Sequence, residues 1–163
     1  MSGVVHVLVI TCAHRGDDAR IVHRQVRSLL EHDHSVTLIA PDPGEEGRRQ
    51  DPSGLERVVI ARAVGWRRMS AWREARRVAR RFARVVDVVL VHDPELLPVI
   101  GFGRWHGARL VWDVHEDFSA SVADRGWIPG LLQPLVKRLV GFLEWFARRR
   151  FGVILAENSY RAR

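Results

Sequence analysis

Short apolar runs alternate along the chain with longer segments in which apolar residues recur every three or four positions. The short runs are rich in valine, isoleucine and leucine, so they predict buried strands. The longer segments predict amphipathic helices that cover a sheet. Six strands are predicted, at residues 4–10, 36–40, 57–61, 88–91, 109–112 and 153–156. The main helices are predicted at residues 19–32 and 70–85, and residues 127–150 form a long apolar-basic segment broken near Gly130 and Pro134.

This alternation predicts one α/β domain, residues 1–163, with a Rossmann-like fold and a parallel sheet of about six strands. Residues 4–10 are apolar at nearly every position, so we expect them to form the central strand, between 36–40 and 88–91. Ser70 is predicted to cap the helix that follows it, and the polar residues 41–52 are predicted to form an exposed turn region.

The end of the sequence gives a further expectation about domain organisation. Asn158 or Ser159 is predicted to cap a helix, and the sequence stops inside that helix. We therefore expect residues 1–163 to be the first half of a larger protein.

Polar clusters follow two neighbouring strands of the predicted sheet. A strand–helix–strand unit within one sheet is parallel, so both clusters emerge at the carboxyl edge, where open α/β folds bind ligands. We expect His14, His92 and His115 to lie together on that edge. The two clusters are His92-Asp93-Pro94-Glu95, in which Pro94 begins a helix that ends at Gly107, and Asp113-Val114-His115-Glu116-Asp117.

The positive charge is carried almost entirely by arginine. The net charge is +7 and Lys137 is the lone lysine. Such a surface favours phosphates or an anionic membrane, although most single arginines are expected to cover solvated faces. One cysteine excludes an intrachain disulfide and indicates a reducing, cytoplasmic compartment. No apolar run reaches the roughly 20 residues of a membrane span, and no leader peptide is recognisable.

Several familiar chemistries are excluded by the motifs. The loop after the first strand has neither the G-x-G-x-x-G fingerprint nor a P-loop, and no nucleophile elbow occurs. The His–acid spacing fits no zinc pattern, so no metal site is expected. The chemistry that remains for these clusters is recognition of sugar hydroxyls, which carboxylates and imidazoles bind through hydrogen bonds. Alternatively, Asp93 and Asp113 cap helices and turns. Structural roles are expected for His6, His23, His32, His34 and His106.

Three motifs together resemble the N-terminal domain of retaining, family-four glycosyltransferases with the GT-B fold, over nearly the whole chain. The first is His14 followed by Asp17-Asp18-Ala19-Arg20-Ile21. The second is His92-Asp93-Pro94-Glu95-Leu96-Leu97-Pro98. The third is Val111-Trp112-Asp113-Val114-His115-Glu116-Asp117, with Trp112 where tyrosine is usual.

The resemblance implies transfer of a sugar from a nucleotide-sugar donor to a saccharide or lipid-linked acceptor, in a cleft facing a second, C-terminal domain. His115 matches the active-site histidine of the family. His14 and Arg15 lie in the loop that approaches the donor phosphates. The nucleotide sugar is a substrate, so no cofactor is implied. The residues expected to bind substrate are His14, Arg15, Arg20, His92, Asp93, Glu95, Asp113, Glu116 and Asp117.

The nucleotide-binding C-terminal domain is absent from residues 1–163, so the isolated chain is expected to be inactive without that domain or a separate subunit. Two alternatives remain: a stand-alone module that binds the acceptor or recruits a partner, and an unrelated Rossmann-like nucleotide-binding protein.

Residues 127–150 suit either a core helix or an interfacial helix. Together with the arginines of 73–84, they suggest peripheral contact with anionic lipid on the inner membrane face. No nucleic-acid partner is expected.

Overall fold

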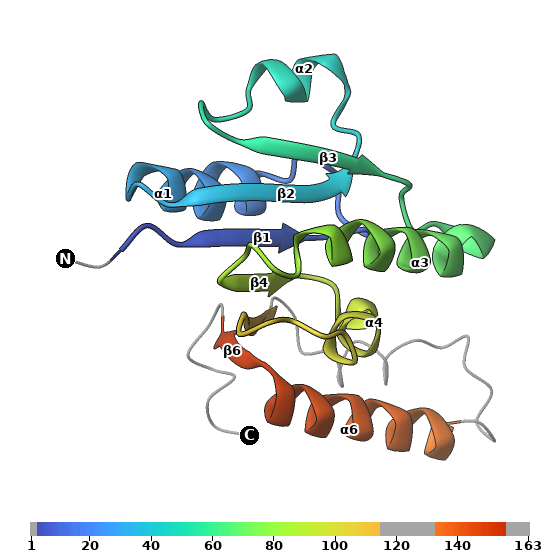
Figure 1. Ribbon diagram of the computed structural model, residues 1–163. Coiled ribbons are helices and arrows are strands. Elements are labelled where there is room, and N and C mark those ends of the chain that lie inside the picture. Colours follow the sequence, from blue (N-terminus) through green and yellow to red (C-terminus); the bar gives the residue numbers. More distant parts are fainter. Residues whose placement is uncertain (1–2, 115–132, 156–163) are drawn as a thin grey trace.

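The computed structural model describes residues 3–114 and 133–155, which form one parallel sheet with helices packed on its faces (Figure 1). The strand order is β3-β2-β1-β4-β5-β6, and every neighbouring pair is parallel. This order confirms the Rossmann-like prediction, with residues 6–10 between the strands at 35–41 and 88–91. The strands are β1 (His6–Ile10), β2 (Ser35–Pro41), β3 (Glu56–Ile60), β4 (Val88–Val91), β5 (Arg109–Val114) and β6 (Gly152–Leu155).

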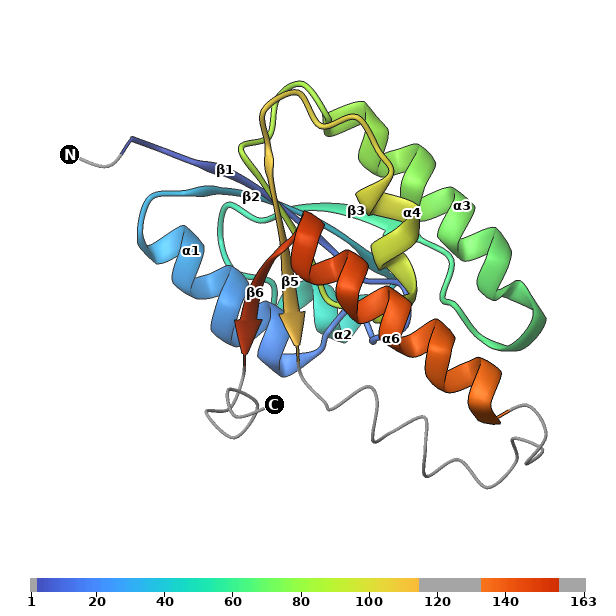
Figure 2. The ribbon, with the colours of Figure 1, turned by 90° about the horizontal axis from the view of Figure 1, so that it is seen from below.

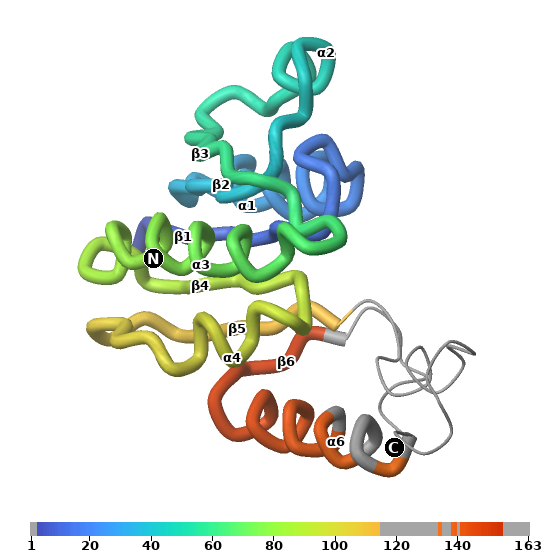
Figure 3. The backbone as a smooth tube through the Cα atoms, turned by 90° about the vertical axis from the view of Figure 1, so that its right-hand side faces the viewer, coloured from blue at the N-terminus to red at the C-terminus, as the bar shows by residue number. Residues whose placement is uncertain are grey.

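The helices lie in two layers (Figures 2 and 3). One face of the sheet carries the wide, π-helical turn η1 (Arg20–Val26), which continues into α1 (Arg27–Glu31). The opposite face carries α3 (Arg68–Ala79), α4 (Leu97–Gly101) and α6 (Gln133–Arg150). Shorter segments are α2 (Gly44–Arg49) and the 3₁₀ turns η2 (Gly65–Arg67), η3 (Arg80–Phe82) and η4 (Pro94–Leu96).

The sequence of β1 explains its central place. Val7 and Val9 pack with η1 on one face, whereas Leu8 and Ile10 pack towards α3 and α4 on the other. All four side chains are buried. A strand that is covered on both faces needs apolar residues at successive positions, and that is the pattern from which its location was predicted.

The predicted cap at Ser70 is wrong. The α3 helix begins two residues earlier, at Arg68, directly after η2. The Ser70 hydroxyl donates instead to the Arg67 carbonyl oxygen at 2.7 Å. Gly65 has a φ of 51°, which glycine adopts readily, so the chain turns into the helix before Ser70 is reached. The helix also ends earlier than predicted, at Ala79, and continues as η3 to Phe82.

Residues 41–52 are more ordered than the predicted turn region, because they contain α2. The Asp42 carboxylate accepts a hydrogen bond from the N–H of Gly44 at 2.9 Å and a second one from Arg48 Nη2 at 2.8 Å. Two glutamates in the first turn and two arginines in the last turn match the helix dipole. These local interactions fold a short helix that carries no apolar stripe to predict it.

The longer predicted helices also differ in detail. The helix predicted at 19–32 has the expected extent, but its first half is π-helical. Part of the segment 127–150 is α6, where Ala147 is buried against the core and Trp145 is half-exposed. Residues 156–163, with the predicted last helix, lie outside the described residues. Within the described part of the chain, no helix combines the length and hydropathy needed to cross a bilayer.

Candidate functional site

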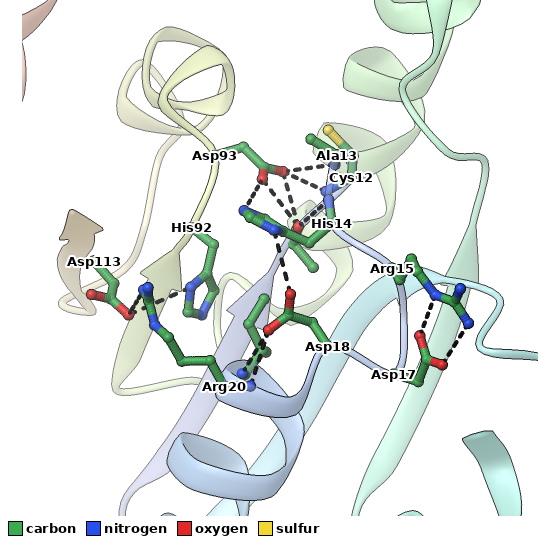
Figure 4. A network of polar contacts seen from close by, with 12 residues as sticks. Cys12, Ala13, His14, Arg15, Asp17, Asp18, Arg20, His92, Asp93 and Asp113 are labelled. Carbon is green, nitrogen blue, oxygen red and sulfur yellow. Dashed lines mark hydrogen bonds and ion pairs between the residues drawn. The ribbon is translucent and has the colours of Figure 1, made fainter. Parts of the chain in front are cut away.

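The carboxyl ends of β1, β4 and β5 bring together a network of polar side chains (Figure 4). Thr11 follows β1, His92 and Asp93 follow β4, and Asp113 lies near the end of β5. Between β1 and β4 the strand order reverses direction, and this is the point at which open α/β sheets bind ligands. The structure therefore confirms that His14 and His92 share one edge of the sheet.

Asp93 holds the loop that follows β1. Its carboxylate is buried and accepts hydrogen bonds from the Thr11 hydroxyl at 3.1 Å and from the backbone N–H groups of Cys12 and Ala13. Hydrogen bonds from backbone N–H groups to a buried, charged carboxylate are strong, so they hold the backbone of this loop in place. Asp93 therefore has a structural role in this loop, which is the alternative that the sequence left open.

His14 lies between two carboxylates at the surface end of the network. Its Nε2 atom is 3.5 Å from Asp93 Oδ1, and its Nδ1 atom is 3.6 Å from Asp18 Oδ2. Asp18 also accepts hydrogen bonds from the N–H groups of Arg20 and Ile21, so it begins η1 while facing His14. The imidazole is about one-third exposed, so it is oriented from beneath and reachable from solvent.

His92 and Asp113 form the buried part of the network. His92 Nδ1 is 3.6 Å from Asp113 Oδ2, and both side chains are almost fully buried. Burial, and then the charges of His14 and Arg20, lower the pKa of His92 to about 3. His92 is therefore a neutral imidazole at neutral pH and adds no charge to the network.

Asp113 is held by the helical layer on the other side. Its Oδ2 atom accepts a hydrogen bond from Gln25 and lies 3.4 Å from Arg20 Nη2. Burial raises the pKa of the Asp113 carboxyl, and the Gln25 hydrogen bond and the charge of Arg20 oppose that rise. The Arg20 guanidinium remains about one-third exposed, so it connects the buried carboxylate to the surface.

Two other predicted site residues point elsewhere. Arg15 pairs with Asp17 through two hydrogen bonds of 2.9 and 2.8 Å and lies apart from the network in Figure 4. Glu95 pairs with Arg68 at the start of α3, at 2.7 Å. Cys12 is buried beside Asp93, and its burial followed by the nearby carboxylates raises the pKa of the thiol, so thiolate chemistry is disfavoured there.

The structure thus gathers His14, Arg20, His92, Asp93 and Asp113 into one network. Their predicted substrate binding stays a prediction, as does that of Arg15 and Glu95. His115, Glu116 and Asp117 lie outside the described residues. Among the described residues, no group of three or more His, Cys, Asp or Glu side chains is arranged to hold a metal ion.

Sequence reasoning missed Thr11, Asp18 and Gln25 as members of this network. Thr11 and Asp18 stand in the loop after the first strand, which the strand-end argument covers in principle. The signal for Asp18 was its place before the first helix, where an aspartate accepts N–H bonds. Gln25 offers no such signal, because its role depends on the rotation of η1 against β5.

Comparison with known proteins assigns the family. Among curated proteins, none matches the chain significantly. A solved structure described as the glycotransferase of kitacinnamycin is similar, with 16% sequence identity and a TM-score of 0.43. The similarity covers 90% of this chain and 38% of that one, so this chain spans well under half of its length. The profile of Glycosyltransferase Family 4 matches residues 19–161, most of the chain. The chain therefore belongs to glycosyltransferase family 4.

Proposed function

We propose that this chain forms the acceptor-side wall of a glycosyltransferase. The enzyme moves a sugar from a nucleotide-sugar donor to a saccharide or lipid-linked acceptor. The second wall is a nucleotide-sugar-binding domain in the same protein or a separate subunit. The observation that supports this proposal most directly is the polar network at the carboxyl edge of a family 4 domain, with His14 and Arg20 at its surface end.

The chemistry of the network suits a polar, charged substrate. Arg20 offers guanidinium N–H donors beside the edge, and such donors recognise phosphate and carboxylate oxygens. His14 adds an imidazole that two carboxylates orient. Groups held in place before the substrate arrives stabilise charge that develops on a leaving phosphate without reorganising. In this proposal the buried His92 and Asp113 position Arg20, and they need not touch substrate themselves.

His115 is the proposed catalytic residue, on the basis of its match to the family motif. One positioned catalytic group is worth about 10²-fold or more in rate. The chain alone supplies one wall, so it is expected to transfer no sugar from any nucleotide donor.

The test is an assay of sugar transfer by the chain joined to a family 4 nucleotide-sugar-binding domain. Uridine, guanosine and adenosine diphosphate sugars labelled in the sugar are offered with saccharide and polyprenyl phosphate acceptors. The joined protein is expected to be active and the chain alone inactive. His115→Ala in the joined protein should lower turnover ~10²-fold. Transfer by the isolated chain would contradict the half-enzyme proposal.

The element η1 supplies a matched pair of variants for the same assay. Arg20 reaches Asp113 at the edge, whereas Arg24 on the next turn is exposed. Arg20→Gln should lower kcat/KM at least ~10-fold, the scale of one lost charged contact. Arg24→Gln should leave it unchanged. Equal effects of the two substitutions on kcat/KM would show that Arg20 does not belong to the site. Acceptor binding to the isolated chain, measured by calorimetry, gives a readout that is independent of the joined domain.

A further inference from the structure

One surface of the molecule concentrates its positive charge. Residues 61–85, which contain η2, α3 and η3, hold nine arginines and one glutamate, a net charge of +8 against +7 for the whole chain. Four exposed arginines recur at three- and four-residue intervals along α3, η3 and the turn that follows η3, whereas Ala71, Ala75 and Ala79 of α3 are buried against the core. This cationic face consists of Arg73, Arg77, Arg80 and Arg84, all exposed.

An apolar tip adjoins the cationic face at the start of α3. Trp66 is fully exposed, and Val64 and Met69 are more than half exposed. The one acidic residue of the segment 61–85, Glu74, accepts a hydrogen bond from the N–H of Ala61 at 3.0 Å. Three large apolar side chains together at the surface cost free energy in water, so the tip suits an apolar partner.

The tip adjoins the candidate site. Arg68, between Trp66 and Met69, pairs with Glu95 at 2.7 Å, two residues from Asp93. Arg62 donates from Nε to the carbonyl oxygen of Ala13 at 3.2 Å, in the loop that carries His14. Figure 1 shows that the beginning of α3 lies at the edge of the sheet where the strands end. The tip and the site therefore open on the same side of the fold.

We propose that residues 64–84, from η2 through α3 and η3 to the turn that follows, form a membrane-docking surface, with the cationic face on anionic lipid headgroups and the Trp66 tip inserted between them. Arginines of a helix that lies on a bilayer are attracted to anionic headgroups, and tryptophan favours the boundary with the acyl chains. A nucleic acid would satisfy the arginines, but it would leave Val64 and Met69 without an apolar environment. The combination of the two features therefore favours a bilayer.

This surface deepens the proposed function, on which its biological role rests, because it selects a lipid-linked acceptor. A protein docked by the tip holds the carboxyl edge beside the headgroup layer. The polar part of a lipid-linked acceptor reaches His14 and Arg20 there, while its lipid stays in the bilayer. Docking itself needs no catalysis, so it is measured on the chain alone.

The test is sedimentation with vesicles of phosphatidylcholine alone or with 30% phosphatidylglycerol. Anionic vesicles should bind the chain and neutral vesicles should not, with binding that fades as salt rises. Changing Arg73, Arg77, Arg80 and Arg84 to glutamine should weaken binding at least ~20-fold, since each arginine near an anionic surface contributes a severalfold gain. Trp66→Ala, which keeps every charge, should weaken binding about 5-fold or more. Circular dichroism melting confirms that each variant is folded.

The control removes four other exposed arginines, by changing Arg24, Arg27, Arg48 and Arg49 to glutamine. This variant has the same net charge as the first one and should keep most of the binding. Equal loss in both variants would show an unspecific charge effect and overturn the proposal. If Trp66→Ala leaves vesicle binding unchanged, or if single-stranded RNA binds as tightly as vesicles, the surface binds polyanions in general and the proposal of a bilayer is wrong. Each of these results leaves the transfer assay of the joined protein unaffected.

Discussion

The Asp93 carboxylate accepts hydrogen bonds from the N–H group of Cys12, which is buried, and from that of Ala13, which is half-buried. Asp93→Ala leaves these donors and the Thr11 hydroxyl without the carboxylate. A buried donor that loses its partner costs its full desolvation penalty, so we expect the free energy of unfolding to fall by about 3 kcal/mol. Urea unfolding followed by circular dichroism measures this change. Glu31→Ala, at an exposed carboxylate in the last turn of α1, is the control and should leave the midpoint in place.

The buried His92 makes stability depend on pH. Its pKa falls from 6.5 in the unfolded chain to about 3 in the folded protein, chiefly because of burial. Below pH 6.5 the unfolded chain binds a proton that the folded protein does not. Stability is therefore fully present above pH 6.5 and is lost as the pH falls towards 3, by roughly 1.4 kcal/mol per unit. His92→Gln should remove this dependence, measured as unfolding free energy from pH 7 to 4.

Asp113 acts in the opposite direction within the same network. Its raised pKa means that the folded protein binds a proton more tightly than the unfolded chain, a contribution that is lost as the pH rises through the folded-state value. The comparison of His92→Gln with wild type separates the two groups, because both proteins contain Asp113. Parallel pH profiles for the two proteins would show that His92 does not titrate as described.

At the residue scale, the sequence predicts which strand ends meet but not which side chains pair. His14 and His92 could be placed on one edge because parallel strands share a direction. The pairing of Arg15 with Asp17, away from the network, depends on the path of a loop. Loop paths are set by contacts such as Arg57 Nη1 with the Gly16 carbonyl oxygen, which join residues far apart in the sequence.

Among the elements, the loop after β1 packs so tightly on β2 that Gly16 has no room for a side chain. A Cβ atom there would lie 1.9 Å from the carbonyl oxygen of Pro41, which is backbone and cannot rotate away. Gly16→Ala must therefore displace the loop or the end of β2. We expect a loss of about 2 kcal/mol in unfolding free energy, the usual cost of overpacking. A thermal midpoint equal to wild type would show that the loop yields easily.

Gly141 in α6 presents the reverse case. It lies in a helix, is exposed, and a Cβ atom there would meet nothing within 4 Å. Alanine loses less backbone entropy than glycine in a helix, so Gly141→Ala should raise the free energy of unfolding by roughly 0.5–1 kcal/mol. The two glycine variants thus have opposite predicted signs in one urea experiment. Destabilisation by Gly141→Ala would mean that α6 packs differently around that turn.

At the element scale, periodicity predicts strands and long helices, and local chemistry changes their ends. The strand at 88–91 has the predicted bounds because aspartates and a proline flank a fully apolar run. The beginning of α3 was misplaced because the conformation of Gly65 decides it, and a glycine alone does not reveal its φ. The α2 helix was missed because six polar residues have no apolar period.

Across the whole molecule, burial predicts an order of stability among the strands. β1 and β4 are central, whereas β3 and β6 are at the two ends of the sheet. Amide hydrogen exchange should be slowest in β1 and β4, where opening requires global unfolding, and faster in β3 and β6. Mass spectrometry of peptic fragments measures this order. Equal protection of β6 and β1 would indicate that β6 is covered by further structure.

The strand order was predictable in outline because a strand that is apolar on both faces must be central. The network at its carboxyl edge was predictable only in part, since Gln25 enters it through the packing of η1. A helix face can be predicted from sequence, but its rotation by a few tens of degrees against the sheet cannot. That rotation decides which side chain reaches Asp113.

The long sequence separation within the network has a consequence for synthesis on the ribosome. Asp93 follows its partners Thr11, Cys12 and Ala13 by 80 to 82 residues. At roughly 5–20 residues per second, several seconds pass between the emergence of the loop and that of its anchor. During this interval β4 is also missing, so β1 presents an unpaired edge rich in valine and leucine. One of the two central strands of the finished sheet thus keeps an open edge in the growing chain until β4 has been synthesised.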